Sequence, residues 1–127
     1  MRTIDFRGKD ILTGEWRYGM LVTDRKRSFI VVHMTGNWSQ IKNLSIKYYV
    51  VGMHEVIAET VGQFTGLLDK NGEMIFEGDI DDVGWIVCFE QGVFCIKQKL
   101  TSITYIPLSE INNINIIGNI HDNPELL

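Results

Sequence analysis

The chain has 127 residues, which is enough for one domain with a sizeable hydrophobic core. Hydrophobic residues make up 45% of the sequence and charged residues 22%, a balance that excludes intrinsic disorder and predicts a globular fold. The net charge of -4 argues against a protein that binds polyanions through its overall charge.

Charge is divided unevenly along the chain. Residues 1–63 carry nine Lys or Arg against six Asp or Glu, whereas residues 64–127 carry three against ten. Either the halves complement each other, within one fold or across an oligomer contact, or the first half forms a basic patch for nucleic acid. We favour complementarity because the cations are scattered.

The beginning of the chain does not have the pattern of a secretory signal peptide, since it carries Arg2, Asp5, Arg7, Lys9 and Asp10. No apolar run approaches the roughly 20 residues that a membrane helix needs. We therefore expect a cytoplasmic protein, in which thiols stay reduced.

Helical periodicity is nearly absent, and short apolar stretches alternate with Gly, Asn, Asp and Ser. This pattern predicts an all-β fold of many short antiparallel strands. The expected strands are Ile4–Arg7, Glu15–Thr23, Ser28–Met34, Lys47–Val51, Val56–Val61, Gln63–Leu68, Glu73–Glu77, Trp85–Glu90, Val93–Gln98, Thr101–Ile106 and Asn115–Ile120.

One or two helical turns at most are expected, and residues 107–112 are the best place for one because Pro107 cannot continue a strand ladder. Short strands with a helical turn before the last one are the order of SH3-like barrels. We therefore predict a single domain over residues 1–127. In it, residues 1–60 are the more variable part, and residues 61–127 form a hairpin-rich half of the SH3-like barrel type.

A tight hairpin is predicted at Asp69-Lys70-Asn71-Gly72. A type I turn followed by Gly72 in the left-handed region closes a three-residue loop, in which the Asp69 carboxylate accepts hydrogen bonds from turn amides. Replacing Gly72 with Val is expected to destabilise the fold through backbone strain.

This register has consequences for the neighbouring side chains. It places Leu68 opposite Met74 and Gly66 opposite Phe76, so Gly66 leaves room for the ring of Phe76. Gly78 is expected to bend the chain after the hairpin. The shared apolar face is predicted to contain Phe64, Leu68, Met74 and Phe76.

Three stretches carry a family resemblance. Residues 60–80 read TVGQFTGLLDKNGEMIFEGDI, residues 6–9 read FRGK, and residues 117–127 read IGNIHDNPELL. In this order they resemble the YopX family of bacteriophage and prophage proteins. The Asp81-Asp82 pair departs from the basic or β-branched strand that often follows in the family, and residues 20–58 match weakly. The resemblance implies a β-rich fold and a mobile-element origin, but no reaction and no catalytic residue.

A group of carboxylates is the most suggestive chemical feature. On an extended strand Glu77, Asp79 and Asp81 project to one face, where they are weak candidates for Mg²⁺ or Ca²⁺ ligands or for acid–base catalysis. The alternative, which we favour, is structural, because Gly78 breaks the alternation and acidic residues keep sheet edges soluble. We expect no metal and no cofactor.

Two cysteines flank the turn at Gln91-Gly92. A two-residue loop places Cys88 directly opposite Cys95, whereas a three-residue loop places Cys88 opposite Phe94. Only the first register permits a disulfide, and a strained one, and a cytoplasmic origin favours free buried thiols.

Aromatic and cationic side chains indicate contact surfaces. Trp38 lies in a polar, loop-like segment, and one of the adjacent Tyr48 and Tyr49 must face outward if they lie on a strand. The cations of the segment Asp24–Arg27 fit a solvated turn better than a phosphate clamp. The interaction candidates are Trp38, Tyr48, Tyr49, Arg25, Lys26 and Arg27.

No nucleophile elbow, Walker A or dinucleotide-binding motif occurs in the sequence. We therefore expect a non-enzymatic protein-interaction or self-assembling module, whose partner is a host or phage protein or a second copy of the chain. The alternatives are a nucleic-acid-binding accessory protein that uses the basic first half and, less favoured, a metal-assisted hydrolase. No membrane partner is expected.

Overall fold

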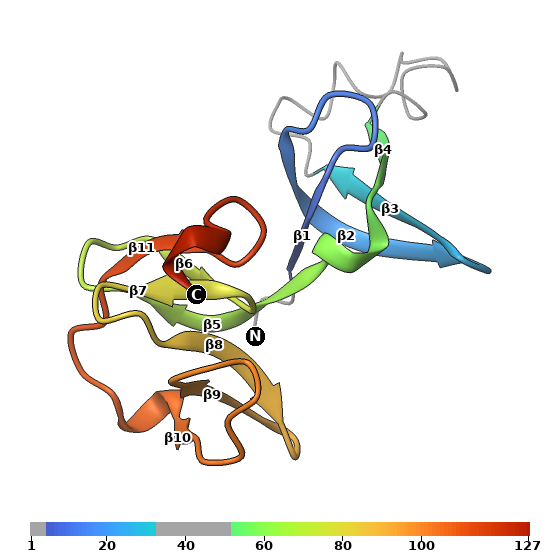
Figure 1. Cartoon of the computed structure of the whole chain (residues 1–127). Helices are drawn as coiled ribbons and strands as arrows, with labels where there is room; N and C mark the ends of the chain where they lie inside the picture. Colours follow the sequence, from blue (N-terminus) through green and yellow to red (C-terminus); the bar gives the residue numbers. More distant parts are fainter. Residues whose placement is uncertain (1–4, 33–51) are drawn as a thin grey trace. The chain divides into compact units, whose positions relative to one another are not determined.

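The computed structural model describes residues 5–32 and 52–127, which fall into two compact units, Ile4–Val61 and Gly62–Leu127 (Figure 1). Within each unit the strand pairings described are antiparallel, so the predicted all-β antiparallel fold is confirmed. The helical segments of the described residues are three short 3₁₀ turns, one more than expected. They are η1 (Ala58–Thr60), η2 (Leu108–Glu110) and η3 (Pro124–Leu126).

In the first unit the strands follow the order β4-β3-β2-β1. They are β1 (Phe6–Lys9), β2 (Trp16–Asp24), β3 (Arg27–Val32) and β4 (Met53–Val56). Beyond β1, Asp10 bridges to Val56 in β4, so the two outer strands of this set are joined. Gly8 is required at this approach, because a Cβ there would lie 2.8 Å from Cγ2 of Val56.

The predicted strand at Val56–Val61 is wrong beyond Val56, where the chain forms the turn η1. The hydroxyl of Thr60 donates to the carbonyl of Ile57 at 2.6 Å and accepts the backbone N–H of Lys9 at 2.9 Å. This local side-chain bonding competes with strand pairing and favours a turn.

In the second unit β10-β9-β8-β7-β11 form a five-stranded sheet, and β5 pairs with β6. The strands are β5 (Gly62–Leu68), β6 (Met74–Phe76), β7 (Asp79–Asp81), β8 (Ile86–Glu90), β9 (Val93–Lys97), β10 (Ile106–Pro107) and β11 (Ile116–Asn119). The five-stranded sheet ends at β10 and β11 and does not close into a barrel.

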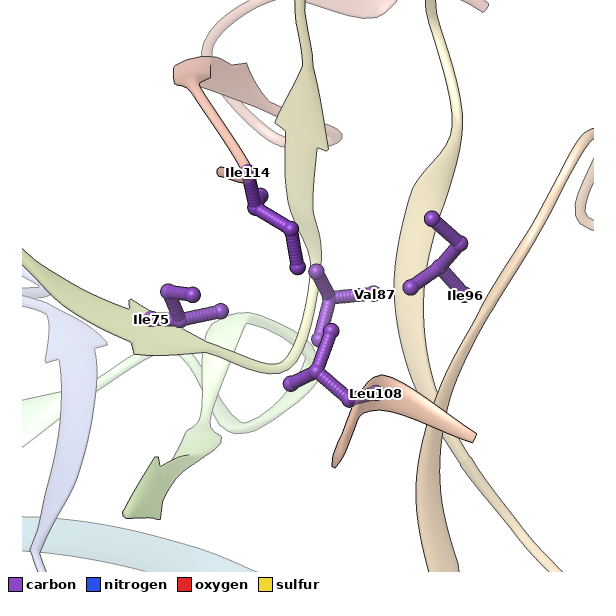
Figure 2. Close-up of a cluster of buried hydrophobic side chains, with 5 residues drawn as sticks. All are labelled: Ile75, Val87, Ile96, Leu108 and Ile114. Atoms are coloured by element: carbon purple, nitrogen blue, oxygen red, sulfur yellow. The ribbon is translucent and has the colours of Figure 1, made fainter. Parts of the chain in front are cut away.

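Five aliphatic side chains form the core of the second unit (Figure 2). They come from β6, β8, β9, η2 and the segment before β11. The core therefore brings together residues that lie far apart in the sequence. They are Ile75, Val87, Ile96, Leu108 and Ile114. Such burial contributes about 25 cal/mol for each Å² of apolar surface removed from water.

The strand predicted at Thr101–Ile106 is wrong except for its last residue. Only Ile106 and Pro107 pair, and they do so with β9 at the edge of the sheet, where a proline without an N–H is tolerated. The helical turn expected over residues 107–112 is confirmed as η2. The strand β7 was not predicted; it follows Gly78, whose φ of +90° turns the chain.

The predicted hairpin turn is confirmed. Asp69 and Glu73 face each other, the N–H of Asp69 donates to the carbonyl of Glu73 at 2.8 Å, and Gly72 has a φ of +81°. The Asp69 carboxylate accepts the backbone N–H groups of Asn71 at 2.8 Å, Glu73 at 3.0 Å and, from β11, Ile116 at 3.2 Å. Burial acts to raise the pKa of Asp69, but these three hydrogen bonds outweigh it and hold the pKa below its usual value.

The register beyond the turn differs from the prediction. Leu68 pairs with Met74 as expected, but Phe76 pairs with Phe64 rather than with Gly66. Gly66 has a φ of +86° and forms an irregularity between the two pairs, and a Cβ there would meet no atom within 4 Å. The glycine is therefore needed for its backbone angle and not to leave room for Phe76.

The predicted apolar face is consequently divided. The rings of Phe64 and Phe76 pack with their centroids 5.7 Å apart and Phe76 is 2% exposed, whereas Leu68 is 59% exposed.

Replacing Gly72 with Val should lower the free energy of unfolding by about 1–3 kcal/mol, because a β-branched residue is strained at positive φ. Space is not the cause, since a Cβ at Gly72 would meet nothing within 4 Å. The measurement is urea unfolding, with Gly72→Asn as the matched control that tolerates the left-handed region at a smaller loss. Equal losses in both variants would contradict the assignment.

Candidate functional site

The predicted interaction residues fall into two sets. Trp38, Tyr48 and Tyr49 lie outside the described residues. The predicted cations occupy the tight turn between β2 and β3, where Asp24 pairs with Arg27 and Arg25 has a φ of +58°.

The described part of the first unit has an exposed apolar sheet face, which we call the outer face. Cross-strand partners share a face, and the register places Met20 opposite Val31, Val31 opposite Met53, and Val22 opposite Phe29. Tyr18 precedes Met20 by two residues and therefore lies on the same face. The outer face consists of Tyr18, Met20, Val22, Phe29, Val31 and Met53.

The two faces of this sheet differ in burial. On the inner face Ile30 is 0% exposed and Val56 is 2% exposed, as expected for a core. On the outer face Met20 is 54% exposed, Tyr18 47%, and Met53 41%. One-sided antiparallel sheets usually present polar residues to water, so an apolar outer face indicates a contact surface.

An ion pair marks one end of the outer face. The guanidinium of Arg27 binds the carboxylate of Glu55 through two hydrogen bonds of 3.0 and 2.8 Å, and it lies 5.0 Å from the centre of the Phe29 ring. These two hydrogen bonds lower the pKa of Glu55 and raise the pKa of Arg27. Of the three turn cations, Arg27 stays charged, but its charge is balanced by Glu55. Arg25 and Lys26 remain to provide net positive charge.

The outer face was not predicted from the sequence, although one signal pointed to it. The segment Phe29–Val32 is apolar at four consecutive positions, where a strand with one face in water should alternate. A continuous run indicates burial on both faces, and the described residues bury only one.

A second cluster that the sequence did not reveal surrounds Asp10, which is 4% exposed. One carboxylate oxygen accepts the N–H groups of Leu12 and Thr13, and the other binds the Nε of Arg17 at 3.0 Å and lies 3.4 Å from Nδ1 of His54. The bond from Leu12 lowers the pKa of Asp10 most, burial opposes it, and Arg17 lowers it further. Both oxygens are engaged, so this carboxylate ties the turn after β1 to β2 and β4.

The three carboxylates named as weak metal-ligand candidates each accept backbone hydrogen bonds. Glu77 accepts the N–H of Gln63 at 2.9 Å, Asp79 accepts that of Phe76 at 2.8 Å, and Asp81 accepts those of Val83 at 3.1 Å and Trp85 at 2.8 Å. No three His, Cys, Asp or Glu side chains of the described residues are grouped so as to hold a metal ion. These bonds support the structural interpretation of the carboxylates.

The second unit has a groove of about 400 Å³. The lining includes the apolar residues Leu67, Leu68 and Ile111, and Lys70 lines the groove as well. Its one carboxylate, Asp69, already binds three backbone N–H groups. The groove therefore offers no free carboxylate or imidazole for acid–base catalysis.

The cysteines lie opposite each other, as the two-residue loop predicts. Both are free thiols; Cys95 is buried and Cys88 is partly exposed. Across the ranges 5–32 and 52–127, no helix is long and apolar enough to cross a membrane.

The model of the family described as "YopX protein" matches residues 5–127. No curated protein matches the sequence.

Replacing Asp81 with Ala should destabilise the protein by about 1–3 kcal/mol without any ion present, because two backbone N–H groups lose their acceptor. The loss is measured by thermal melts. The control is Asp82→Ala, a substitution of the exposed neighbouring residue, which should have a smaller effect. The unmodified chain should have the same melting temperature in Mg²⁺, Ca²⁺ and EDTA. A higher melting temperature with either ion would establish a metal site.

Proposed function

The chain belongs to the YopX family, and we propose that it is a non-enzymatic interaction module that assembles with further copies of itself. The outer face of the first unit carries this proposal, because its six apolar side chains form a surface that water solvates poorly. The family resemblance further supports a phage or prophage origin and action in the cytoplasm of the bacterial host.

Charge favours a second copy of the chain as the occupant of the outer face. Residues 4–61 carry eight Lys or Arg against six Asp or Glu, and residues 62–127 carry three against ten. Arg25 and Lys26 are exposed in the β2–β3 turn. The second unit offers exposed acidic side chains at Glu73, Asp82, Glu110 and Glu125. The acidic unit of one copy therefore complements the cationic end of the outer face of another.

This contact joins two different surfaces and is heterologous. Such contacts close into rings or continue as open assemblies, depending on the rotation between neighbours. Because part of the attraction is between exposed charges, salt should weaken the assembly.

Substituting Met20 with Lys should reduce self-association, because a charge in the centre of the outer face loses hydration when the face is covered. The measurement is the mass by light scattering over a concentration series at low salt. Thr23→Lys is the matched control: it adds the same charge on the same strand, and Thr23 pairs with Ser28 on the opposite face.

The unmodified chain and Thr23→Lys should exceed the monomer mass at high concentration and return towards it in salt. Met20→Lys should stay monomeric. A monomer at every concentration of the unmodified chain, or equal behaviour of the two Lys variants, would refute the proposal.

The alternative of nucleic-acid binding is less well supported. Single-strand binding uses aromatic rings that are free to stack on bases, but the cations of Arg7 and Lys9 lie over the Trp16 ring, 4.7 and 5.7 Å from its centre. In addition, Glu55 neutralises Arg27 in the cationic turn.

We accordingly expect no electrophoretic shift of a single-stranded oligonucleotide at low salt. A basic protein of known affinity serves as the positive control. A shift that disappears on adding moderate salt would show electrostatic binding to nucleic acid and would overturn this expectation.

A further inference from the structure

The β8–β9 hairpin brings two thiols together. Its loop is the two-residue turn Gln91-Gly92, with φ values of 49° and 81°, as a tight primed turn requires. Cys88 and Cys95 are therefore a directly opposed pair. Opposed residues of antiparallel strands have Cα atoms about 4.5 or 5.5 Å apart, and both values lie within the range that a disulfide spans.

The two sulfur atoms are 3.0 Å apart, roughly 1 Å longer than a disulfide bond. Cys95 is 0% exposed, whereas Cys88 is partly exposed. A small oxidant can therefore reach Cys88 and not Cys95. Closing the bond requires only a small displacement of the side chains, since the register is already correct.

We propose that Cys88 and Cys95 form a reversible intramolecular disulfide, made by exchange with a low-molecular-weight disulfide such as oxidised glutathione. The Cys88 thiolate attacks one sulfur of this oxidant, giving a mixed disulfide and releasing one thiol. The Cys95 thiolate then attacks the Cys88 sulfur and releases the second thiol. Two protein thiols are oxidised by two electrons, and one small disulfide is reduced to two thiols.

Burial, a hydrogen bond and nearby charges together set the thiolate fraction of Cys88 and therefore the rate of the exchange. Burial, followed by the hydrogen bond with the Cys95 thiol, raises the pKa of Cys88 to about 12. Glu90 on β8 acts in the same direction, whereas Lys97 on β9 opposes it. Because only the thiolate attacks, oxidation is slow at neutral pH. Its rate increases about tenfold for each unit by which the pH rises, as long as the pH stays below that pKa.

The bond stabilises the hairpin that supplies part of the core. The neighbouring pair Val87 and Ile96 both belong to the core of the second unit. The ion pair of Lys97 with Glu90, 2.8 Å long, spans the same two strands. A covalent link here restricts the unfolded chain and raises the stability of the unit. This inference does not depend on self-assembly.

The test is incubation of the full chain with oxidised glutathione at several pH values, followed by alkylation and mass spectrometry. We expect a chain lighter by two hydrogens with no alkylated cysteine, and its formation should accelerate from pH 7 to 9. The melting temperature should rise by several degrees and return after reduction.

The variant Cys95→Ser should accumulate glutathione on Cys88, and Cys88→Ser should stay unmodified because Cys95 is buried. Alkylation of both thiols in the unmodified chain after oxidation, or disulfide-linked dimers alone, would overturn the proposal. These measurements on the unmodified chain decide the question even if a variant fails to fold.

Discussion

The carboxylate of Asp69 is the interaction on which the second unit depends. One oxygen accepts the N–H groups of Asn71 and Glu73 and shapes the hairpin turn, and the other accepts the N–H of Ile116 at the start of β11. A single side chain therefore joins a local turn to a strand more than forty residues away. With β11 held in this way, Ile114 is placed in the core beside Ile75 and Val87. The bonds that lower the pKa of Asp69 are the same bonds that hold this arrangement.

The same device recurs in the described residues. Asp10 binds Leu12 and Thr13 in the first unit, Asp81 binds Val83 and Trp85, and the amide oxygen of Asn119 binds the N–H groups of His121 and Asp122. Short strands need many turns, and each turn exposes N–H groups that must find an acceptor. Turn formation thus accounts for Asp10, Asp69, Asp81 and Asn119 without invoking catalysis.

Because the buried Asp69, Asp79 and Asp81 carboxylates accept backbone hydrogen bonds, our proposals of function rest on other features of the chain. The outer face is apolar and exposed, and its end carries Arg25 and Lys26, while acidic residues predominate in the second unit. The opposed thiols of Cys88 and Cys95 add a chemical feature that is independent of this face. The contact surface and the disulfide that we propose therefore lie in different units of the chain.

The sequence by itself determined the features that depend on local chemistry. These are the strand-rich composition, the turn at Asp69–Gly72 and the family resemblance, whereas two registers stayed open for Cys88 and Cys95 until the structure placed them opposite each other. The turn follows from φ preferences and short-range hydrogen bonds, which depend on a few adjacent residues. Only the tertiary structure decided the features that depend on distant partners.

The irregularity at Gly66 shifts the register so that Phe76 pairs with Phe64. The hydrogen bond of Thr60 to Ile57 favours the turn η1 in place of a strand. The fold also places His54 beside Asp10. The sequence also could not predict that the outer face is exposed. An apolar run such as Phe29–Val32 shows that both faces can be buried, but which face is covered depends on what the rest of the chain packs against it.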